Sequence, residues 1–148
     1  MSGQCANING MSSTYLDLNY HIVFSTKHRL KQIQPEWKPS LHRYMGGTTR
    51  GLGAVALNIN GTSDHVHLLV SLRATHCLAD YLREVKKSTS WFVHQEIGDK
   101  RFKWQEGYSA FTVSAGLRST VNQYIETQEA HHYRRSFREE LIELLREA

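Results

Sequence analysis

A β-hairpin set between two helical segments is the feature that most restricts how this chain can fold. Residues 54–61 (AVALNING) and 65–72 (HVHLLVSL) are short runs rich in apolar and β-branched side chains, and the residues GTSD at their junction are typical of a tight turn. Residues 15–25 (YLDLNYHIVFS) alternate apolar and polar side chains with a period of two, and residues 110–114 (AFTVS) form a further β-rich run. The sequence therefore predicts four strands, the middle two paired as a hairpin.

The first predicted helix lies between the first strand and the hairpin. Pro35 and Pro39 bracket its start, because proline is favoured in the first turn of a helix. Apolar side chains then recur at helical spacing until Gly46, Gly47 and residues 50–53 (RGLG), which are expected to weaken the helix and end it.

Two further helices and a tail follow the hairpin. Thr75 is expected to cap a long helix that runs to about Glu96, and residues 97–108 then predict a polar loop with an aromatic anchor. Residues 117–133 predict a third helix, and residues 136–148 a final amphipathic helix.

The order of these elements predicts an α+β fold. A β-α-β-β-α-β succession is the split β-α-β, or ferredoxin-like, arrangement, with an antiparallel sheet and helices on one face. The other face is expected to be free for a ligand, and the helix over residues 117–133 and the tail helix are additions to this core. Residues 1–13 are small and polar and read as a flexible leader, so residues 14–148 are expected to form a single domain.

Composition narrows the possible settings of the protein. The 148 residues include no apolar run of about 20 and no signal-peptide pattern, which predicts a cytoplasmic protein with no membrane contact. Its two cysteines suggest neither a disulfide framework nor a zinc knuckle. The net charge of +4 favours a polyanionic partner without identifying it.

Two histidines on one predicted strand are the first candidates for chemistry. His65 and His67 are two positions apart, so both imidazoles project from the same side of the strand. This is the geometry of a metal pincer, but it is also that of two hydrogen-bonded structural histidines. His21, on the first strand, is expected to face a neighbour in the sheet.

A tyrosine and a glutamine on the third predicted helix are the second candidates. Tyr124 and Gln128 are four residues apart and therefore lie on the same helical face. Tyrosine offers a nucleophilic oxygen, and glutamine a neutral oxygen ligand. The alternative is a core tyrosine beside a solvated glutamine, although Val121 and Ile125 already supply an apolar stripe.

Four segments of the sequence resemble the successive motifs of one enzyme family. They are YHIVFSTKHR, DHVHLLVS, WQEGYSAFTVS and VNQYIETQEAHH, within about residues 15–133. In this order and spacing they resemble the motifs of the single-tyrosine HUH transposases, the IS200-like insertion-sequence family.

The resemblance implies a role for each candidate residue. The His-hydrophobic-His motif of the family falls on His65 and His67, which would hold a divalent cation, Mg²⁺ or Mn²⁺, with Gln128 as a third ligand. The nucleophile of the family falls on Tyr124. The implied reaction cleaves DNA through a 5′-phosphotyrosine bond, frees a 3′-hydroxyl and rejoins strands without a nucleotide cofactor.

The resemblance also implies partners. These are single-stranded DNA with hairpin ends and a second copy of the chain, in a homodimer whose tyrosine helices complete each other's histidine sites. A strand-binding track needs basic side chains and aromatic rings on which bases stack. The candidates in this sequence are Lys27, Arg29, Lys86, Lys87, Trp104 and Tyr108.

Other functions stay open at this point. A rolling-circle replication initiator or relaxase would also use a tyrosine, usually with a lysine one turn away or a third histidine. A domesticated transposase acting on dispersed genomic repeats would share the chemistry. A non-catalytic nucleic-acid binding module and a zinc hydrolase that uses His131 or His132 beside His65 and His67 are the rivals from other classes.

Overall fold

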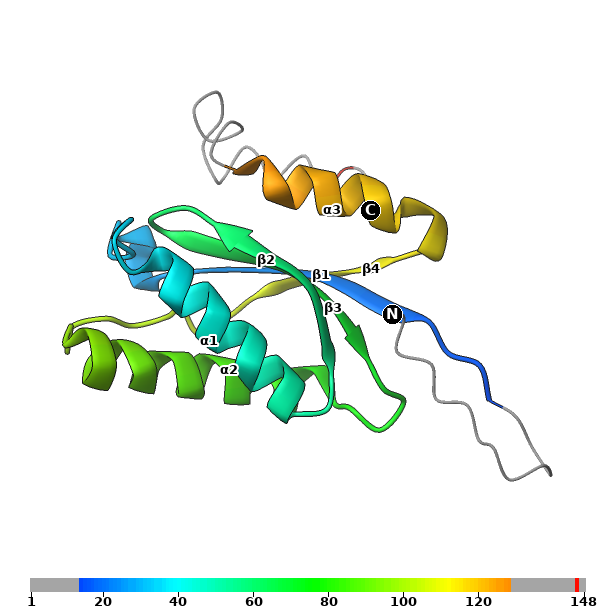
Figure 1. The fold of residues 1–148 in the computed structure, drawn as a ribbon, viewed down its shortest axis with the longest axis horizontal. Coiled ribbons are helices and arrows are strands. Elements are labelled where there is room, and N and C mark those ends of the chain that lie inside the picture. The colour runs from blue at the N-terminus through cyan, green and yellow to red at the C-terminus, as the bar shows by residue number, and fades with distance from the viewer. Residues whose placement is uncertain (1–13, 129–145, 147–148) are drawn as a thin grey trace.

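A four-stranded antiparallel sheet organises the protein, as seen in a computed structural model that describes residues 14–128 and 146 (Figure 1). The spatial order of the strands is β2-β3-β1-β4, which is the order of the predicted ferredoxin-like arrangement. The strands are β1 (Leu18–Ser25), β2 (Val55–Gly61), β3 (His65–Leu72) and β4 (Ser109–Val113), and the α-helices are α1 (Lys38–Gly51), α2 (Leu78–Phe92) and α3 (Arg118–Glu126). The predicted α+β fold and its four strands are confirmed.

The main core lies between the sheet and the pair α1 and α2. Successive side chains of a strand point to opposite faces. Val66, Leu68 and Val70 of β3 therefore pack, with Ile22 and Phe24 of β1, against α1 and α2, and all five are fully buried. The side chains that alternate with these five along the strands, the histidines included, point to the opposite face.

The opposite face of the sheet is not open, contrary to our expectation from sequence. Helix α3 lies across it, so that the sheet is sandwiched between α3 and the pair α1 and α2 (Figure 1). Leu69 of β3, Val113 of β4 and Ile125 of α3 form a second, smaller buried cluster. This apolar contact holds α3 against the sheet and covers the histidines.

Helix α1 passes without interruption through the glycines that were expected to weaken it. It ends at Gly51, inside the RGLG segment, and Pro39 occupies its first turn as predicted. Gly46 is buried and sits against Ile59 of β2, and Thr49 donates a hydrogen bond to the Met45 carbonyl, 2.9 Å away. Tertiary packing here outweighs the low helix propensity of glycine.

The predicted cap of α2 is wrong. The helix starts at Leu78 with Cys77 at the N-cap position, and no side chain caps it. His76 instead fixes the preceding turn, because its Nδ1 accepts from the Arg73 N–H at 2.8 Å and its Nε2–H donates to the Leu52 carbonyl at 2.7 Å. These two bonds place Thr75 in the turn, outside the helix.

The end of α2 lies close to the predicted one. The α-helix ends at Phe92, and a π-helical turn (Val93–Ile97) continues it.

Several predicted segments lie outside the part of the chain that the structure describes. They are the leader, residues 129–133 at the end of the predicted third helix, and the predicted tail helix apart from residue 146. In the described ranges, no helix combines the length and apolar character needed to cross a membrane.

Candidate functional site

The two histidines of β3 lie side by side on the face that α3 covers. Both side chains are fully buried, and their ring centroids are 5.1 Å apart with the planes at 72°. Strand alternation accounts for the shared face, because His65 and His67 are two residues apart. Both imidazoles therefore lie inside the protein, between the sheet and α3.

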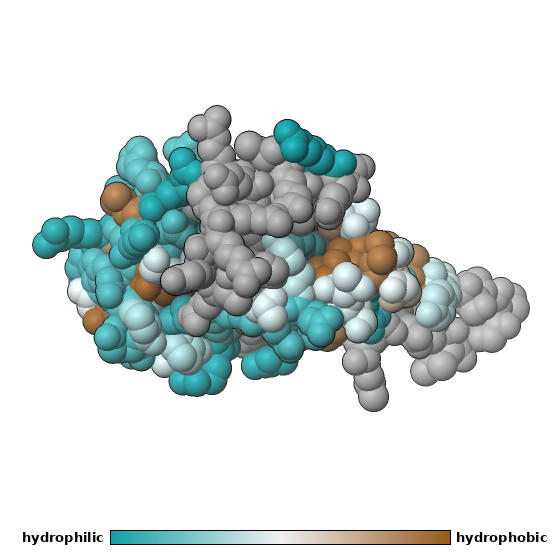
Figure 2. Space-filling view, turned by 90° about the horizontal axis from the view of Figure 1, so that it is seen from above, coloured by the Kyte–Doolittle hydropathy of each residue, from teal (hydrophilic) through white to brown (hydrophobic). Residues whose placement is uncertain are grey.

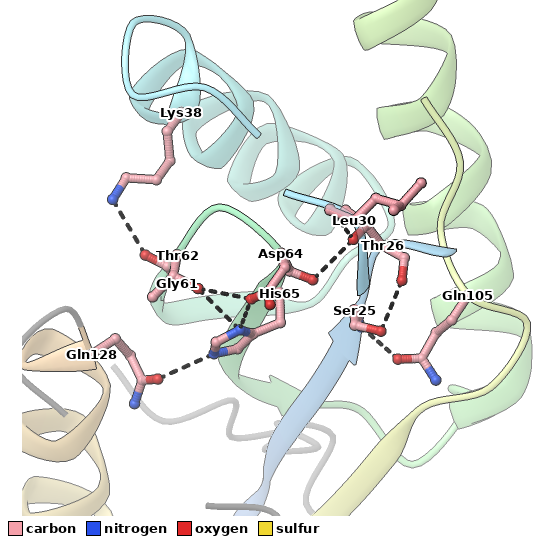
Figure 3. Close-up of polar contacts among 10 residues, drawn as sticks. All are labelled: Ser25, Thr26, Leu30, Lys38, Gly61, Thr62, Asp64, His65, Gln105 and Gln128. Carbon is pink, nitrogen blue, oxygen red and sulfur yellow. Dashed lines mark hydrogen bonds and ion pairs between the residues drawn. The ribbon is translucent and has the colours of Figure 1, made fainter. Parts of the chain in front are cut away.

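His65 is held through one ring nitrogen. Its Nδ1 lies 2.7 Å from Asp64 Oδ1 and 3.0 Å from Thr62 Oγ1, while the Thr62 hydroxyl donates to Asp64 Oδ1 (Figure 3). A carboxylate only accepts hydrogen bonds, so a neutral His65 carries its proton on Nδ1. Its Nε2 then presents a lone pair towards α3.

Gln128 meets that lone pair from the helix side. Its side chain is fully buried, its Nε2 donates to the Tyr124 carbonyl at 3.2 Å, and its Oε1 lies 3.4 Å from His65 Nε2 (Figure 3). A proton on His65 Nε2 joins these two atoms by a hydrogen bond; without that proton, two electron-pair donors face each other. Neighbouring ligands of an octahedral Mg²⁺ ion are about 3 Å apart, so these two atoms suit adjacent positions around one cation.

Tyr124 completes the group from the last turn of α3. Its ring is half-buried and stands edge-on to the His67 ring, with centroids 5.9 Å apart and planes at 77°. The structure thus brings together the four residues selected as nucleophile and metal ligands. In residues 14–128 and 146, no three His, Cys, Asp or Glu side chains converge on one point. A cation here would rely on the amide of Gln128.

Two asparagines of β2, which were not predicted from sequence, position α3. Asn58 Nδ2 donates to Asn122 Oδ1 at 2.8 Å, and Asn60 Nδ2 donates to the Ile125 and Glu126 carbonyls at 2.9 and 3.2 Å. Asn60 thereby satisfies carbonyls at the end of the helix that have no partner within it. Two amides at alternate positions of one strand were the available signal.

His21 of β1 is a further residue that sequence reasoning left out of the site. Its side chain is 3% exposed, and its Nε2 lies 2.8 Å from His67 Nδ1. Burial lowers the pKa of His21 from 6.5 to about 4, so the ring is neutral at neutral pH. From sequence, His21 is expected only to face a neighbour in the sheet, and it does so through His67.

Most of the predicted strand-binding residues gather in one groove, away from the histidines. The groove has a volume of about 500 Å³ and lies between α2 and the segment before β4; its lining includes Lys27, Lys86, Lys87, Trp104 and Tyr108. It opens on the side of the sheet that α1 and α2 cover. Arg29 is exposed but does not line it.

Two of these residues also hold the segment itself. Trp104 is 7% exposed, donates through Nε1 to Thr89 Oγ1 at 2.9 Å and packs edge-on against Phe24 and Phe102. These contacts make it an anchor of the loop. Tyr108, at 40% exposed, is the aromatic ring of the groove that a base can reach.

Lys86 fastens the same loop by its ammonium group. Nζ donates to the carbonyls of Gln105, Glu106 and Gly107 at 2.9, 3.3 and 2.7 Å and lies 5.7 Å from the centre of the Tyr108 ring. Burial lowers the pKa of Lys86. Its ammonium group therefore contacts both the loop carbonyls and the Tyr108 ring of the groove.

The surface on the α3 side is mostly hydrophilic where the described residues form it, with a compact hydrophobic area at one end (Figure 2). The histidines are beneath this surface, under α3.

Comparison with known proteins identifies the family. The family described as "Transposase IS200 like" matches residues 14–128, which include all four site residues. The chain belongs to the IS200-like transposase family. The family resemblance stated from the sequence motifs is thereby confirmed, and membership implies an enzyme of DNA transposition.

Curated relatives agree with this assignment. The ISDra2 transposase TnpA of Deinococcus radiodurans is 24% identical over 117 residues, which are 75% of this chain and 84% of that protein. The transposase for insertion sequence element IS200 of Salmonella typhimurium is 23% identical over 124 residues, which are 80% of this chain and 81% of the relative.

Solved structures show the same fold. A crystal structure from Deinococcus radiodurans, of a protein named there as a transposase, superposes with a TM-score of 0.60 at 24% identity and covers 79% of this chain and 95% of the other. A REP-associated tyrosine transposase bound to a REP hairpin superposes with a TM-score of 0.61 at 16% identity, covering 82% and 74%.

Proposed function

We propose that this IS200-like transposase cleaves and rejoins single-stranded DNA at insertion-sequence ends, with Tyr124 as the nucleophile. The observation that carries this proposal is the position of Tyr124, whose ring stands edge-on to His67 at 5.9 Å while Gln128, one turn later, reaches His65. A tyrosine that merely filled the core would need no buried histidines and amide beside it.

The donor set of the site suits a hard divalent cation. His65, His67 and Gln128 would hold Mg²⁺ or Mn²⁺, since imidazole and amide ligands with open positions differ from a closed, thiolate-rich zinc site. A cation bound there supplies positive charge at the scissile phosphate. No nucleotide cofactor is needed for the reaction.

The proposed reaction transfers the phosphoryl group of a DNA phosphodiester from the 3′ oxygen to the phenolic oxygen of Tyr124. The phenolic oxygen of Tyr124 attacks the phosphorus and loses its proton, while the bond to the 3′ oxygen breaks and that oxygen leaves as a hydroxyl. The product is a 5′-phosphotyrosine bond, which keeps the phosphodiester energy. A second 3′-hydroxyl attacks this bond, frees the phenol and joins the new strand.

The substrate and assembly follow from the family and from the basic groove. Single-stranded DNA with hairpin ends fits a chain of net charge +4 whose groove presents Lys27, Lys87 and Tyr108. The solved structural neighbour with a bound REP hairpin supports a hairpin as the substrate element. We also propose that the protein is a homodimer. In the described part of this single chain, α3 packs on the sheet of its own chain.

A gel assay tests the function. Purified chain is incubated with Mn²⁺ or Mg²⁺ and labelled single strands of the DNA that flanks the gene, and wild type is compared with Tyr124→Phe and His65→Ala. We expect a covalent protein-DNA adduct with wild type and metal only. Adduct formed by Tyr124→Phe would move the nucleophile elsewhere, and cleavage without adduct would favour the hydrolase. Binding without cleavage in every condition would leave a binding module.

A further inference from the structure

We propose that His21 is a positioning residue that sets the proton of His67. In this arrangement, a neutral His21 accepts a hydrogen bond from His67 Nδ1–H, so that His67 Nε2 is left with a lone pair for a cation. The inference rests on the proposed function, in which His67 is a ligand. It adds a residue that none of the sequence motifs assigned to the site.

The sheet register brings the two rings together. His21 pairs with Leu69 and Val23 pairs with His67 across β1 and β3, so His21 and His67 are diagonal neighbours on the same face. Their rings are nearly parallel, at 24°, with centroids 5.0 Å apart, and the Nε2-to-Nδ1 distance is 2.8 Å. This distance is that of a direct hydrogen bond between two ring nitrogens.

Only one direction of this bond leaves His67 able to bind a cation. If His21 donates, His67 Nδ1 is the acceptor, and the single proton of neutral His67 sits on Nε2, so neither nitrogen has a lone pair to offer. If His67 donates, its Nε2 has no proton. Because Nδ1 is engaged by His21 in both cases, Nε2 is the one nitrogen through which His67 can be a ligand.

His65 shows the same arrangement with a different acceptor. Asp64 accepts a hydrogen bond from His65 Nδ1–H, and His65 Nε2, on the other side of the ring, faces Gln128. Groups that bind the outer nitrogen of a histidine fix its orientation and raise its basicity. A carboxylate does so more strongly than a neutral imidazole, so His65 is the stronger ligand and His67 the weaker.

The surroundings of His21 favour a fixed acceptor. The centre of its ring is 6.3 Å from that of Phe111 and 6.1 Å from that of Tyr124, and the side chain is almost completely buried. Bulk water therefore has little access to replace it beside His67. Loss of the acceptor would allow His67 to carry its proton on Nε2 instead of Nδ1.

Two matched substitutions test the proposal. His21→Leu removes the acceptor at similar volume, and His21→Gln restores an acceptor oxygen at about the reach of Nε2. The first readout is the long-range ¹H–¹⁵N spectrum of the metal-free, ¹⁵N-histidine-labelled chain, which reports the tautomer of His67. The second is Mn²⁺ affinity, measured by electron paramagnetic resonance, with far-UV circular dichroism as the control for folding.

We expect His67 to carry its proton on Nδ1 in wild type and in His21→Gln, and to shift towards Nε2–H in His21→Leu. Mn²⁺ affinity is expected to fall about 10-fold to 100-fold in His21→Leu and to return in His21→Gln. An Nε2–H tautomer in wild type overturns the proposal, as does wild-type Mn²⁺ affinity in folded His21→Leu. Absence of Mn²⁺ binding by wild type refutes the metal site itself, whereas the tautomer measurement tests His21 separately.

Discussion

Acidification should destabilise this protein through His42, a histidine of α1 outside the proposed site. Burial, and to a smaller extent the positive charge of Lys38 one turn earlier, lowers the pKa of His42 from 6.5 to about 4. Its Nε2 is buried with no hydrogen-bond partner among the described residues. Protonation of the folded chain is therefore costly, while the unfolded chain takes up a proton near pH 6.5.

The size of the effect follows from these two pKa values. The pKa of His42 is lower in the folded chain than in the unfolded chain, so its neutral side chain stabilises the fold above pH 6.5. This stabilisation is lost as the pH falls towards 4. For one group with these values, the free energy of unfolding falls by about 2 kcal/mol between pH 7 and pH 5. His21 adds a loss in the same direction, since burial also lowers its pKa to about 4.

Urea denaturation at pH 7 and pH 5 measures this loss in wild type and in two variants. The free energy of unfolding of His42→Gln should fall by about 2 kcal/mol less than that of wild type between the two pH values, because residue 42 no longer takes up a proton. His28→Asn, at an exposed position with positive φ that asparagine tolerates, is the control and should keep the wild-type loss. An equal loss in wild type and His42→Gln would refute the reasoning.

Two further predictions concern the hairpin and the loop beside the groove. Gly61→Ala should lower the free energy of unfolding by about 1–3 kcal/mol in urea titrations, because its Cβ would collide with the His65 carbonyl and lie 2.9 Å from Val66 Cα. Gly116→Ala, where a Cβ meets nothing within 4 Å, is the control, and equal costs would contradict the clash. Lys86→Met should cost about 1 kcal/mol and speed proteolysis within residues 98–108, because the loop carbonyls lose their shared donor. Lys87→Met, at an exposed position, should leave the rate of proteolysis unchanged. Equal rates of proteolysis in the two variants would show that Lys86 does not hold the loop.

Sequence periodicity was sufficient to predict the strands and their order in the sheet. Alternation in residues 15–25 and the hairpin around GTSD depend on local rules, so the sheet and the shared face of His65 and His67 were predictable. The motifs selected Tyr124 and Gln128, and the structure places both beside those histidines.

The errors came from contacts that are distant in sequence. Gly46 remains helical because Ile59 of β2 packs on it, and Thr75 is not a cap because His76 reaches the Leu52 carbonyl. The docking of α3 was missed for the same reason, since the amide of Asn60 reveals its helical partner only in three dimensions. One histidine on a strand likewise does not show which neighbour it will bind, so His21 was left out.

The alternation along β3 has a consequence for how such a gene decays. Val66, Leu68 and Val70 build the main core, while His65 and His67, on the same strand, contribute their side chains to the opposite face. Under the proposed function, a substitution at either histidine ends catalysis and leaves that core intact. Inactive descendants of this gene are therefore expected to encode folded chains that keep the basic groove, and selection for the proposed DNA binding alone would preserve them after strand transfer is lost.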